Sequence, residues 1–214
     1  MYVLGLTGGI ASGKSTVASM LHQRGAAIID ADKLGHRVLE PGSAGWAAIV
    51  EAFGPEIVSE NGEIDRRRLG AVVFSDAAQR ARLNAISHPR IRAMALEEIA
   101  TLRARGDVDV AVVDAALLFE GKWDDFCDEV WVVYAPEDVA VARLVARNGL
   151  TVDEARERLR AQLPIEEKRA RGDVVIENNG SLADLRAQVD QAWAGLLRRA
   201  RGEAPPLRQA GAPA

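Results

Sequence analysis

The fold of this chain is decided by the run Gly8-Gly9-Ile10-Ala11-Ser12-Gly13-Lys14-Ser15-Thr16. It matches the pattern G-x-x-x-x-G-K-[ST], with Gly8, Gly13, Lys14 and Ser15 in the fixed positions. The two glycines let the backbone form a tight concave turn, so that successive N–H groups can point at phosphate oxygens. The helix that follows presents its partly positive N-terminus to the same anion. The run therefore predicts a phosphate-binding loop.

A lysine and a hydroxyl follow the second glycine of the loop. We expect Lys14 to reach the β- and γ-phosphates of a nucleoside triphosphate, and the Ser15 hydroxyl to hold Mg²⁺. Ser15 is the residue predicted to bind the metal ion. The residues predicted to bind the nucleotide at the loop are Gly8, Gly9, Ala11, Ser12, Gly13, Lys14, Ser15 and Thr16.

The surroundings of the loop agree with this interpretation. The apolar run at residues 2–7 is typical of a buried strand. After the loop, Val17, Met20 and Leu21 recur at helical spacing, and Gly25 is a typical helix C-cap. The order strand, glycine loop, helix is the one that the motif requires, which disfavours a glycine-rich turn with an incidental lysine.

Composition limits the possible classes of protein. The 214 residues, 48% hydrophobic, suffice for one α/β domain with an insertion or for two small domains. The net charge of −4 gives no general electrostatic case for nucleic-acid or membrane binding, and no segment is long and apolar enough to span a bilayer. Cys127, the single cysteine, excludes a disulfide framework and a Cys-based zinc site. We expect a soluble, cytoplasmic monomer, with a weak oligomer left open.

A second predicted strand, residues 26–30, ends in Asp30-Ala31-Asp32. Ligands of parallel α/β sheets bind beyond the carboxyl ends of the strands, so a carboxylate here can accept the proton of an attacking hydroxyl. Asp32 is the candidate base. The alternative is that Asp30 or Asp32 caps a helix beginning at Lys33, and the residues alone leave both open.

From residue 41 to 106 the strand pattern is absent, and the spacing predicts several helices. One contains Phe53, Asn61-Gly62 marks a turn, and Asp65 caps a helix with a basic first turn. We expect Pro89, in His88-Pro89, to start a further helix. This region is predicted to be a helical insertion. Its arginines at 66–68 favour a solvated helix face over an anion site.

A third predicted strand ends in Asp114, in the form of a Walker B element whose acid supports Mg²⁺. Many buried strands end in Asp, so the sequence leaves this role of Asp114 open. Leu117-Leu118-Phe119-Glu120 follows, with Glu120 expected at a helix start, and residues 129–134 form the fourth predicted strand.

A helix predicted at residues 138–147 carries Arg143 and Arg147, four apart and thus on one face. The charged segment 148–171 is either a solvated helical hairpin or a mobile lid that closes over the phosphates. The last predicted strand covers residues 173–177, and Ser181 begins a capping box for a final helix. Residues 201–214 are predicted to form a flexible tail.

Taken together, these motifs resemble those of the dephospho-CoA kinase family, from about Val3 to Trp193. A phosphate loop alone is generic, but the order of the other segments is specific to that family. The resemblance rests on the loop with its preceding strand, Ile29-Asp30-Ala31-Asp32, Asn84-Ala85-Ile86-Ser87-His88-Pro89, Leu117-Leu118-Phe119-Glu120, Gln162, Lys168 and Val174-Val175-Ile176-Glu177-Asn178-Asn179-Gly180.

The resemblance implies transfer of the ATP γ-phosphoryl group to the ribose 3′-hydroxyl of dephospho-CoA, giving CoA and ADP. ATP and Mg²⁺ are the implied cofactors, and dephospho-CoA is the small-molecule partner. It implies an α/β fold of the P-loop NTPase kind, with a five-stranded parallel sheet, helices on both faces, a helical substrate-binding insertion and a lid. The corresponding ranges are 1–40, 107–147 and 172–200 for the nucleotide-binding core, 41–106 for the insertion and 148–171 for the lid.

The resemblance also implies roles for single residues. Asp32 would act as the base, together with Lys14 and Arg143 as catalytic residues. Arg147 and Asn178 would join the loop in binding ATP. The residues expected at the substrate are Asp32, His88, Leu117, Glu120, Gln162 and Lys168.

Two positions depart from the family pattern, which usually has Pro at Ala116 and Ala at Gly172. Neither departure removes a chemical group, but both affect the expected loop geometry. The nearest rival is a nucleoside or nucleotide kinase of the same fold. A GTP-dependent switch is excluded because N-K-x-D is absent. A scaffold role would leave Lys14, Asp32 and Arg143 without a purpose.

Overall fold

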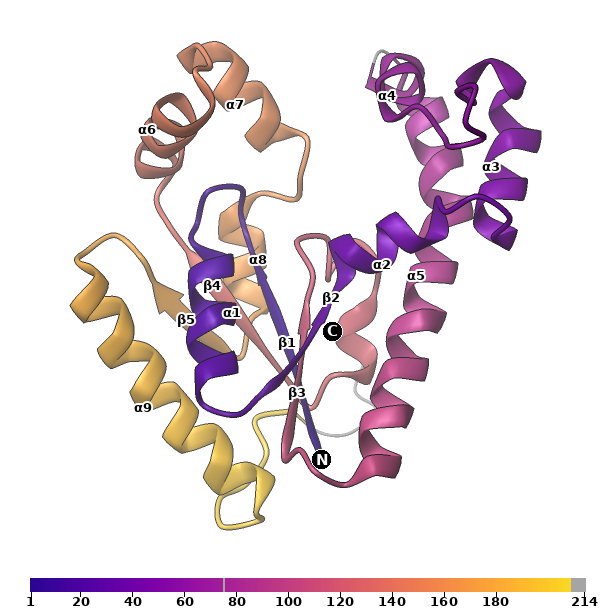
Figure 1. Cartoon of the computed structure of the whole chain (residues 1–214). Helices are drawn as coiled ribbons and strands as arrows, with labels where there is room; N and C mark the ends of the chain where they lie inside the picture. Colours follow the sequence, from indigo (N-terminus) through magenta and orange to yellow (C-terminus); the bar gives the residue numbers. More distant parts are fainter. Residues whose placement is uncertain (75, 209–214) are drawn as a thin grey trace. The chain divides into compact units, whose positions relative to one another are not determined.

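The strands form a parallel five-stranded sheet in the strand order β2-β3-β1-β4-β5 (Figure 1). The structure is a computed structural model that describes residues 1–74 and 76–208. The strands are β1 (Tyr2–Gly8), β2 (Ala27–Asp30), β3 (Val110–Asp114), β4 (Glu129–Tyr134) and β5 (Val174–Glu177). Their short apolar runs suit strands that are covered on both faces, and the α/β fold expected from the sequence is confirmed.

The helices of the described residues lie between and after these strands. They are α1 (Lys14–Gln23), α2 (Ala31–Val38), α3 (Ala44–Phe53), α4 (Arg66–Phe74), α5 (Ala77–Arg105), α6 (Glu137–Asn148), α7 (Val152–Arg160), α8 (Ile165–Arg171) and α9 (Leu182–Ala200). Two short 3₁₀ turns, η1 (Pro55–Ile57) and η2 (Trp123–Phe126), complete the described elements. None of the helices in the described part of the chain combines the length and apolar character that a membrane span needs.

The chain divides into two compact units. Of the described residues, the first unit comprises 1–29 and 99–208 and contains the sheet except Asp30, the last residue of β2. The second unit comprises the described residues from 30 to 98. The segment 148–171 folds within the first unit as the helices α7 and α8.

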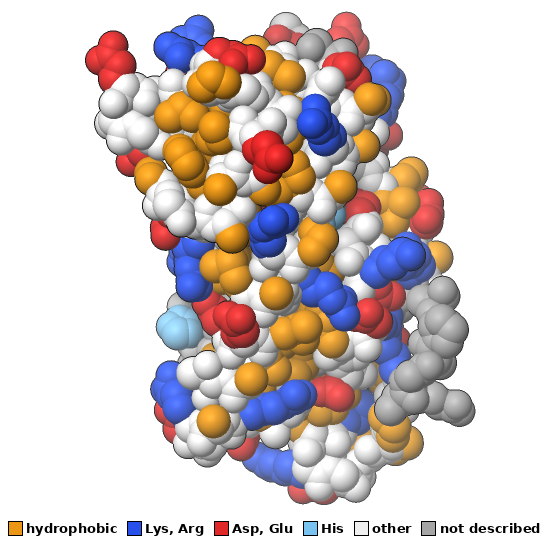
Figure 2. All heavy atoms as spheres, turned by 90° about the vertical axis from the view of Figure 1, so that its right-hand side faces the viewer, with side chains coloured by type: hydrophobic (Ala, Val, Ile, Leu, Met, Phe, Trp, Pro, Cys, Tyr) orange, Lys and Arg blue, Asp and Glu red, His pale blue; other side chains and the backbone are white. Residues whose placement is uncertain are grey.

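The second unit has a small apolar core of its own. Ile49 and Phe53 of α3 and Leu69 of α4 are buried in it, and Ile86 and Ile91 of α5 pack against them. On the face drawn in Figure 2, Lys and Arg side chains are interspersed with Asp and Glu and with small apolar patches. The expected helix around Phe53 and the Asp65 cap, which accepts from the N–H groups of Arg67 and Arg68, are confirmed.

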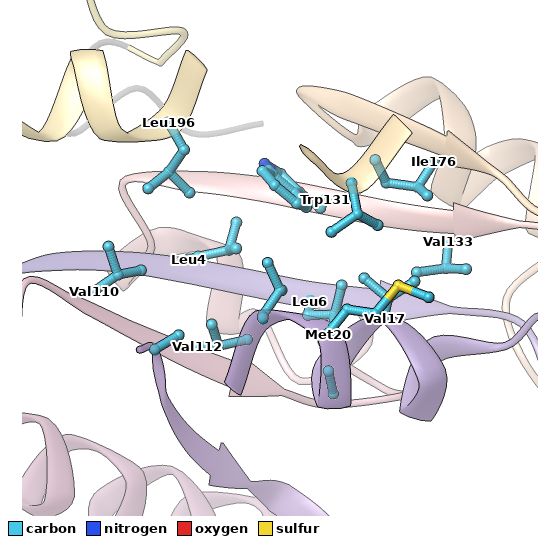
Figure 3. Packing of buried hydrophobic residues seen from close by; sticks show 14 of the residues in the cluster. Leu4, Leu6, Val17, Met20, Val110, Val112, Trp131, Val133, Ile176 and Leu196 are labelled. Carbon is cyan, nitrogen blue, oxygen red and sulfur yellow. The ribbon is translucent and has the colours of Figure 1, made fainter. Parts of the chain in front are cut away.

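The core of the first unit joins α1 and α9 to the sheet (Figure 3). Val17 and Met20 of α1 and Leu196 of α9 belong to one cluster with Leu6 of β1 and Trp131 of β4. Fully burying a side chain such as Leu6 contributes about 1.5–3 kcal/mol, so this contact fixes the helix that follows the loop. The same packing therefore holds the phosphate-binding loop at the end of β1.

A buried charge ties the end of α9 to the sheet. Glu129, at the start of β4, is 0% exposed, and its carboxylate accepts from Arg199 at 2.6 and 3.0 Å. It also accepts from the indole of Trp131 and the hydroxyl of Tyr2. Burial and the neighbouring Glu129 charge raise the pKa of Tyr2, so this hydroxyl stays a donor. The buried carboxylate is thus fully paired, as a charge in an apolar core must be.

Two local predictions are wrong. Pro89 does not begin a helix but lies inside α5, because apolar packing continues on both sides of it and outweighs the roughly 3 kcal/mol cost of an interior proline. Glu120 lies in a turn, not at a helix start. Gly121 donates to Leu117 O, and Lys122 then takes the left-handed conformation (φ 55°), which separates this turn from η2 at Trp123.

Part of the segment expected to be a flexible tail is bonded to the first unit. α9 ends at Ala200, yet Arg208 forms ion pairs with Asp173 and Asp124 and donates to Arg171 O. These bonds hold residue 208 beside the start of β5. Residues 209–214 of the expected tail lie outside the described residues.

Candidate active site

The phosphate-binding loop runs from the last residue of β1 to the first residue of α1. Ala11 (φ 60°) and Gly13 (φ 96°) adopt the left-handed conformation, and Ser12 N–H donates to Gly9 O at 3.1 Å. α1 starts directly afterwards at Lys14. The loop therefore has the tight turn that the sequence predicts.

Both glycines of the motif are required by their surroundings. A Cβ atom at Gly8 would lie 2.6 Å from Ser12 Oγ and 2.6 Å from Val133 O. A Cβ atom at Gly13 would overlap the side-chain amide of Asn178, and the positive φ adds strain. Ser12 Oγ is buried and has no hydrogen-bond partner among the described residues. A buried hydroxyl with a spare proton beside a turn of N–H groups suits a phosphate oxygen.

Arg143 and Asn178 hold this loop through hydrogen bonds to its carbonyl groups. The guanidinium of Arg143 donates to Ala11 O at 3.2 Å and to Asn178 O at 2.9 Å. The amide of Asn178, which is 9% exposed, donates to Ser12 O at 2.6 Å. The structure thus brings two predicted site residues to the loop and gives both the same task of holding its carbonyl groups. Arg147, four residues further along α6, is exposed and donates to the side chain of Asn148.

Lys14 forms an ion pair with Asp114, at the end of β3. Ser15 follows Lys14 in the first turn of α1 and is exposed. A hydroxyl and a carboxylate are hard oxygen donors that suit Mg²⁺, which binds through one or two protein ligands together with phosphates and water. Within the described residues no group of three or more His, Cys, Asp or Glu side chains forms a metal cage. The residues present therefore fit a metal held largely by a nucleotide.

Lys168 is buried, although it belongs to the charged segment 148–171, which the sequence predicts to be a solvated hairpin or a mobile lid. Its side chain is 0% exposed, and its ammonium group donates to Ala116 O at 2.6 Å and pairs with Glu120 at 3.0 Å. Burial lowers the pKa of Lys168, Glu120 acts in the opposite direction, and the charge of Lys14 lowers it further. Leu117, in the same turn as Glu120, is 38% exposed.

A cavity of about 420 Å³ opens beside the loop. Gly9 and Ser12 line it from the loop, and Gln162, a predicted site residue, lines it from the α7–α8 connection. Arg156 and Arg160 of α7 also line it, although the sequence analysis did not single them out. Their spacing of four residues on a helix is the signal that could have found them.

The remaining predicted residues belong to the second unit. Asp30 caps α2, since its carboxylate accepts from the N–H groups of Asp32 and Lys33 at 3.0 and 3.1 Å. Asp32, in the first turn of α2, is exposed. Of the two aspartates, the structure thus gives the cap to Asp30. His88 is half-buried within α5.

Comparison with known proteins identifies the family to which these features belong. The family model described as dephospho-CoA kinase matches residues 2–184. A dephospho-CoA kinase of Geobacter sulfurreducens is 50% identical over 194 residues, which cover 91% of this chain and 98% of that protein.

Two solved structures have the same fold as this chain. A crystal structure from Thermus thermophilus has a TM-score of 0.77 at 38% identity and covers 91% of this chain and 97% of its own. A dephospho-CoA kinase of Campylobacter jejuni has a TM-score of 0.69 at 29% identity and covers 94% of this chain and 98% of its own.

Proposed function

The chain belongs to the dephospho-CoA kinase family, and we propose how its residues divide the work of that family's reaction. The chain is an ATP-dependent kinase that phosphorylates the ribose 3′-hydroxyl of dephospho-CoA and releases CoA and ADP. Its reaction is the last step of coenzyme A biosynthesis. Phosphoryl transfer passes through a loose transition state, so positioning and charge neutralisation carry most of the rate enhancement.

The loop holds the triphosphate. N–H groups of residues 8–16 and the N-terminus of α1 surround the phosphates, and Lys14 leaves Asp114 to contact the β- and γ-phosphates. Thr16 and the Ser12 hydroxyl add further donors. Arg143 and Asn178 keep the loop carbonyls turned away from the anion, which is supported by their bonds to Ala11 O and Ser12 O. Arg147 lies on the same helix as Arg143 and would meet the nucleotide from outside the loop.

Mg²⁺ binding is proposed at Ser15, with Asp114 as its carboxylate support. When bound, the metal would neutralise charge on the β- and γ-phosphate oxygens. The support for this role is the carboxylate of Asp114, which pairs with Lys14, and the hydroxyl of Ser15, which follows Lys14 in the chain. Before the nucleotide binds, Asp114 would hold Lys14 through the ion pair between them.

Asp32 is the proposed base that accepts the proton of the attacking hydroxyl. The observation that carries this role is that Asp30, rather than Asp32, caps α2, so the carboxylate of Asp32 is not used by the helix terminus. An exposed carboxylate of ordinary basicity is sufficient because a loose transition state needs little help from a base.

The test of this role is the pair Asp32→Asn and Asp30→Asn. Asp32→Asn should leave ATP affinity intact and lower kcat by about 10²–10⁴-fold, the usual contribution of a positioned base. Asp30→Asn removes a charge two residues away but keeps a good cap, so it should retain turnover. Near-normal kcat in Asp32→Asn would refute the assignment.

The acceptor is tested by ADP release with ATP and Mg²⁺, with and without dephospho-CoA, beside adenosine, AMP, CMP and pantothenate. We expect ADP only with dephospho-CoA, and CoA as the product. Turnover with a nucleoside or nucleotide instead would keep the fold but replace the acceptor. Gln162, which lines the cavity, Leu117 and His88 are the residues proposed to contact the acceptor.

We further propose that the protein works as a cytoplasmic monomer. The support for the cytoplasm as the compartment is chemical. The one cysteine of the chain, Cys127, is buried and forms no disulfide, and burial raises the pKa of its thiol. A chain that uses no disulfide suits a reducing compartment. Sedimentation at several concentrations measures the oligomeric state, and a stable dimer would contradict the proposal.

A further inference from the structure

Glu120 connects three separate segments of the first unit. It lies in the turn after β3, its Oε1 pairs with Lys168 of α8 at 3.0 Å, and the same oxygen accepts from Leu163 N–H at 3.1 Å. Leu163 lies in the connection between α7 and α8. A single carboxylate therefore holds both the middle of α8 and the connection that leads into it.

Lys168 continues these contacts toward the phosphate-binding loop. Its ammonium group donates to Ala116 O, and the hydroxyl of Thr7 donates to the same carbonyl at 3.2 Å. Thr7 is in β1, one residue before the loop begins. Ala116, where the family usually has Pro, uses only its carbonyl group here, and proline would offer the same acceptor. The contacts thus run without a break from the α7–α8 connection to the strand that carries the loop.

The ammonium group of Lys168 is not free to contact a ligand as a mobile lid cation would. Lys168 is 0% exposed, and both described partners of its ammonium belong to the turn after β3. Glu120 Oε2 is buried and has no hydrogen-bond partner among the described residues. An ion pair around a fully buried ammonium contributes little net stability, because desolvation offsets the attraction. Its contact with Leu163, which lines the cavity, therefore requires another explanation.

We propose that Glu120 and Lys168 are positioning residues for phosphoryl transfer. Their ion pair holds the α7–α8 hairpin at the end of β3, so that the hairpin presents Gln162, Arg156 and Arg160 to the cavity beside the loop. This inference rests on the proposed kinase reaction and on the lid role that the family resemblance implies for residues 148–171. It replaces direct substrate contact as the task of Glu120 and Lys168.

The experiment separates positioning from plain stability by comparing Glu120→Leu, Lys168→Met and the double variant. Each single variant leaves one buried charge unpaired, so each should lower both Tm and kcat. The double variant removes both charges and should recover most of the lost Tm. Because the ion pair no longer holds the hairpin, the kcat of the double variant should stay at least about tenfold below the wild-type value. A loss of this size is in line with the cost of small misplacements of reacting groups. KM for ATP should change less than about threefold, since Lys14 and its loop are untouched.

Recovery of kcat together with Tm in the double variant would overturn the proposal, because the pair would then serve stability alone. Glu120→Gln keeps the side-chain shape and an acceptor for Leu163 N–H, so it should fold, and we expect a kcat about fivefold below wild type. Unchanged kcat in this variant would also overturn the proposal.

Arg199→Met is the matched control. It breaks a buried ion pair elsewhere in the same unit, at Glu129, and should lower Tm while kcat per folded molecule is retained. The proposed function itself is tested by the wild-type protein, which must release ADP in response to dephospho-CoA. If another acceptor is used instead, the same variants are compared with that acceptor, so the two failures remain distinguishable.

Discussion

Gly13→Ala tests two contributions to the shape of the phosphate-binding loop. One is the left-handed backbone conformation at Gly13, and the other is the hydrogen bond from the Asn178 amide to Ser12 O. Gly13 has φ 96°, and a Cβ atom there would overlap Asn178 Nδ2. The new methyl group therefore acts in two ways. It strains the backbone, and it pushes away the amide that donates to Ser12 O at 2.6 Å.

The expected loss in the free energy of unfolding is the sum of these two effects. A left-handed conformation costs a residue with a Cβ atom about 1–2 kcal/mol relative to glycine. Loss of the Asn178 hydrogen bond adds about 1 kcal/mol. We expect Gly13→Ala to lower the free energy of unfolding by about 2–3 kcal/mol. Asn178→Ala removes the hydrogen bond alone and should cost about 1 kcal/mol. In the double variant the overlap is gone, so the total should again be about 2–3 kcal/mol rather than the sum of the single changes.

The assay is urea unfolding of the wild type, the two single variants and the double variant. ATP binding by titration calorimetry is measured on the same four proteins. The double-mutant cycle should show a coupling of about 1 kcal/mol between Gly13 and Asn178. ATP affinity should fall in every variant that carries Gly13→Ala, since the N–H groups of the loop are displaced. Strictly additive costs would refute the reasoning, because they would mean that the methyl group never meets the amide.

Three further outcomes are expected. Lys14→Ala should weaken ATP binding and lower kcat together, and a variant that still binds ATP tightly would contradict the loop assignment. Asp30→Ala removes the α2 cap and should cost about 1 kcal/mol in urea unfolding, whereas Asp30→Asn should cost only a few tenths. Hydrogen bonds at three caps hold the pKa values of Asp65, Glu154 and Asp184 below their ordinary values. Their contribution to stability is therefore present above about pH 4 and lost as the pH falls through the lower folded-state values, so the urea midpoint should drop between about pH 5 and 3 and a flat profile would contradict this account.

Local chemistry made much of the fold predictable. The strand at 129–134 is found where the apolar run predicts it, and the helix that Ser181 begins has both hydrogen bonds of its capping box. Gly25, with φ 93°, ends the first helix as expected. Pro89 shows the limit of such signals. Its local preference for a helix start is real, but packing of Ile86 and Ile91 on either side of it decides the outcome.

The candidate site was predictable where a motif fixes the geometry. The loop residues lie together because a single turn contains them. The aspartate that caps α2 depends on where the helix starts. It starts at Ala31, two residues before Lys33, and composition does not reveal this difference. The burial of Lys168 depends on Ala116 and Glu120, some fifty residues away, and a pattern of local charge cannot indicate it.

The pairing of Glu129 with Arg199 has a consequence for the order of protein synthesis. The ribosome completes the sheet well before residue 199 emerges, so Glu129 must remain accessible to water until α9 is made. A chain released before residue 199 could dock the remaining part of α9 only by burying a carboxylate that lacks its positive partner, which is strongly unfavourable. We therefore expect prematurely terminated chains to keep α9 undocked and its apolar face exposed, a state that cellular proteases recognise and remove.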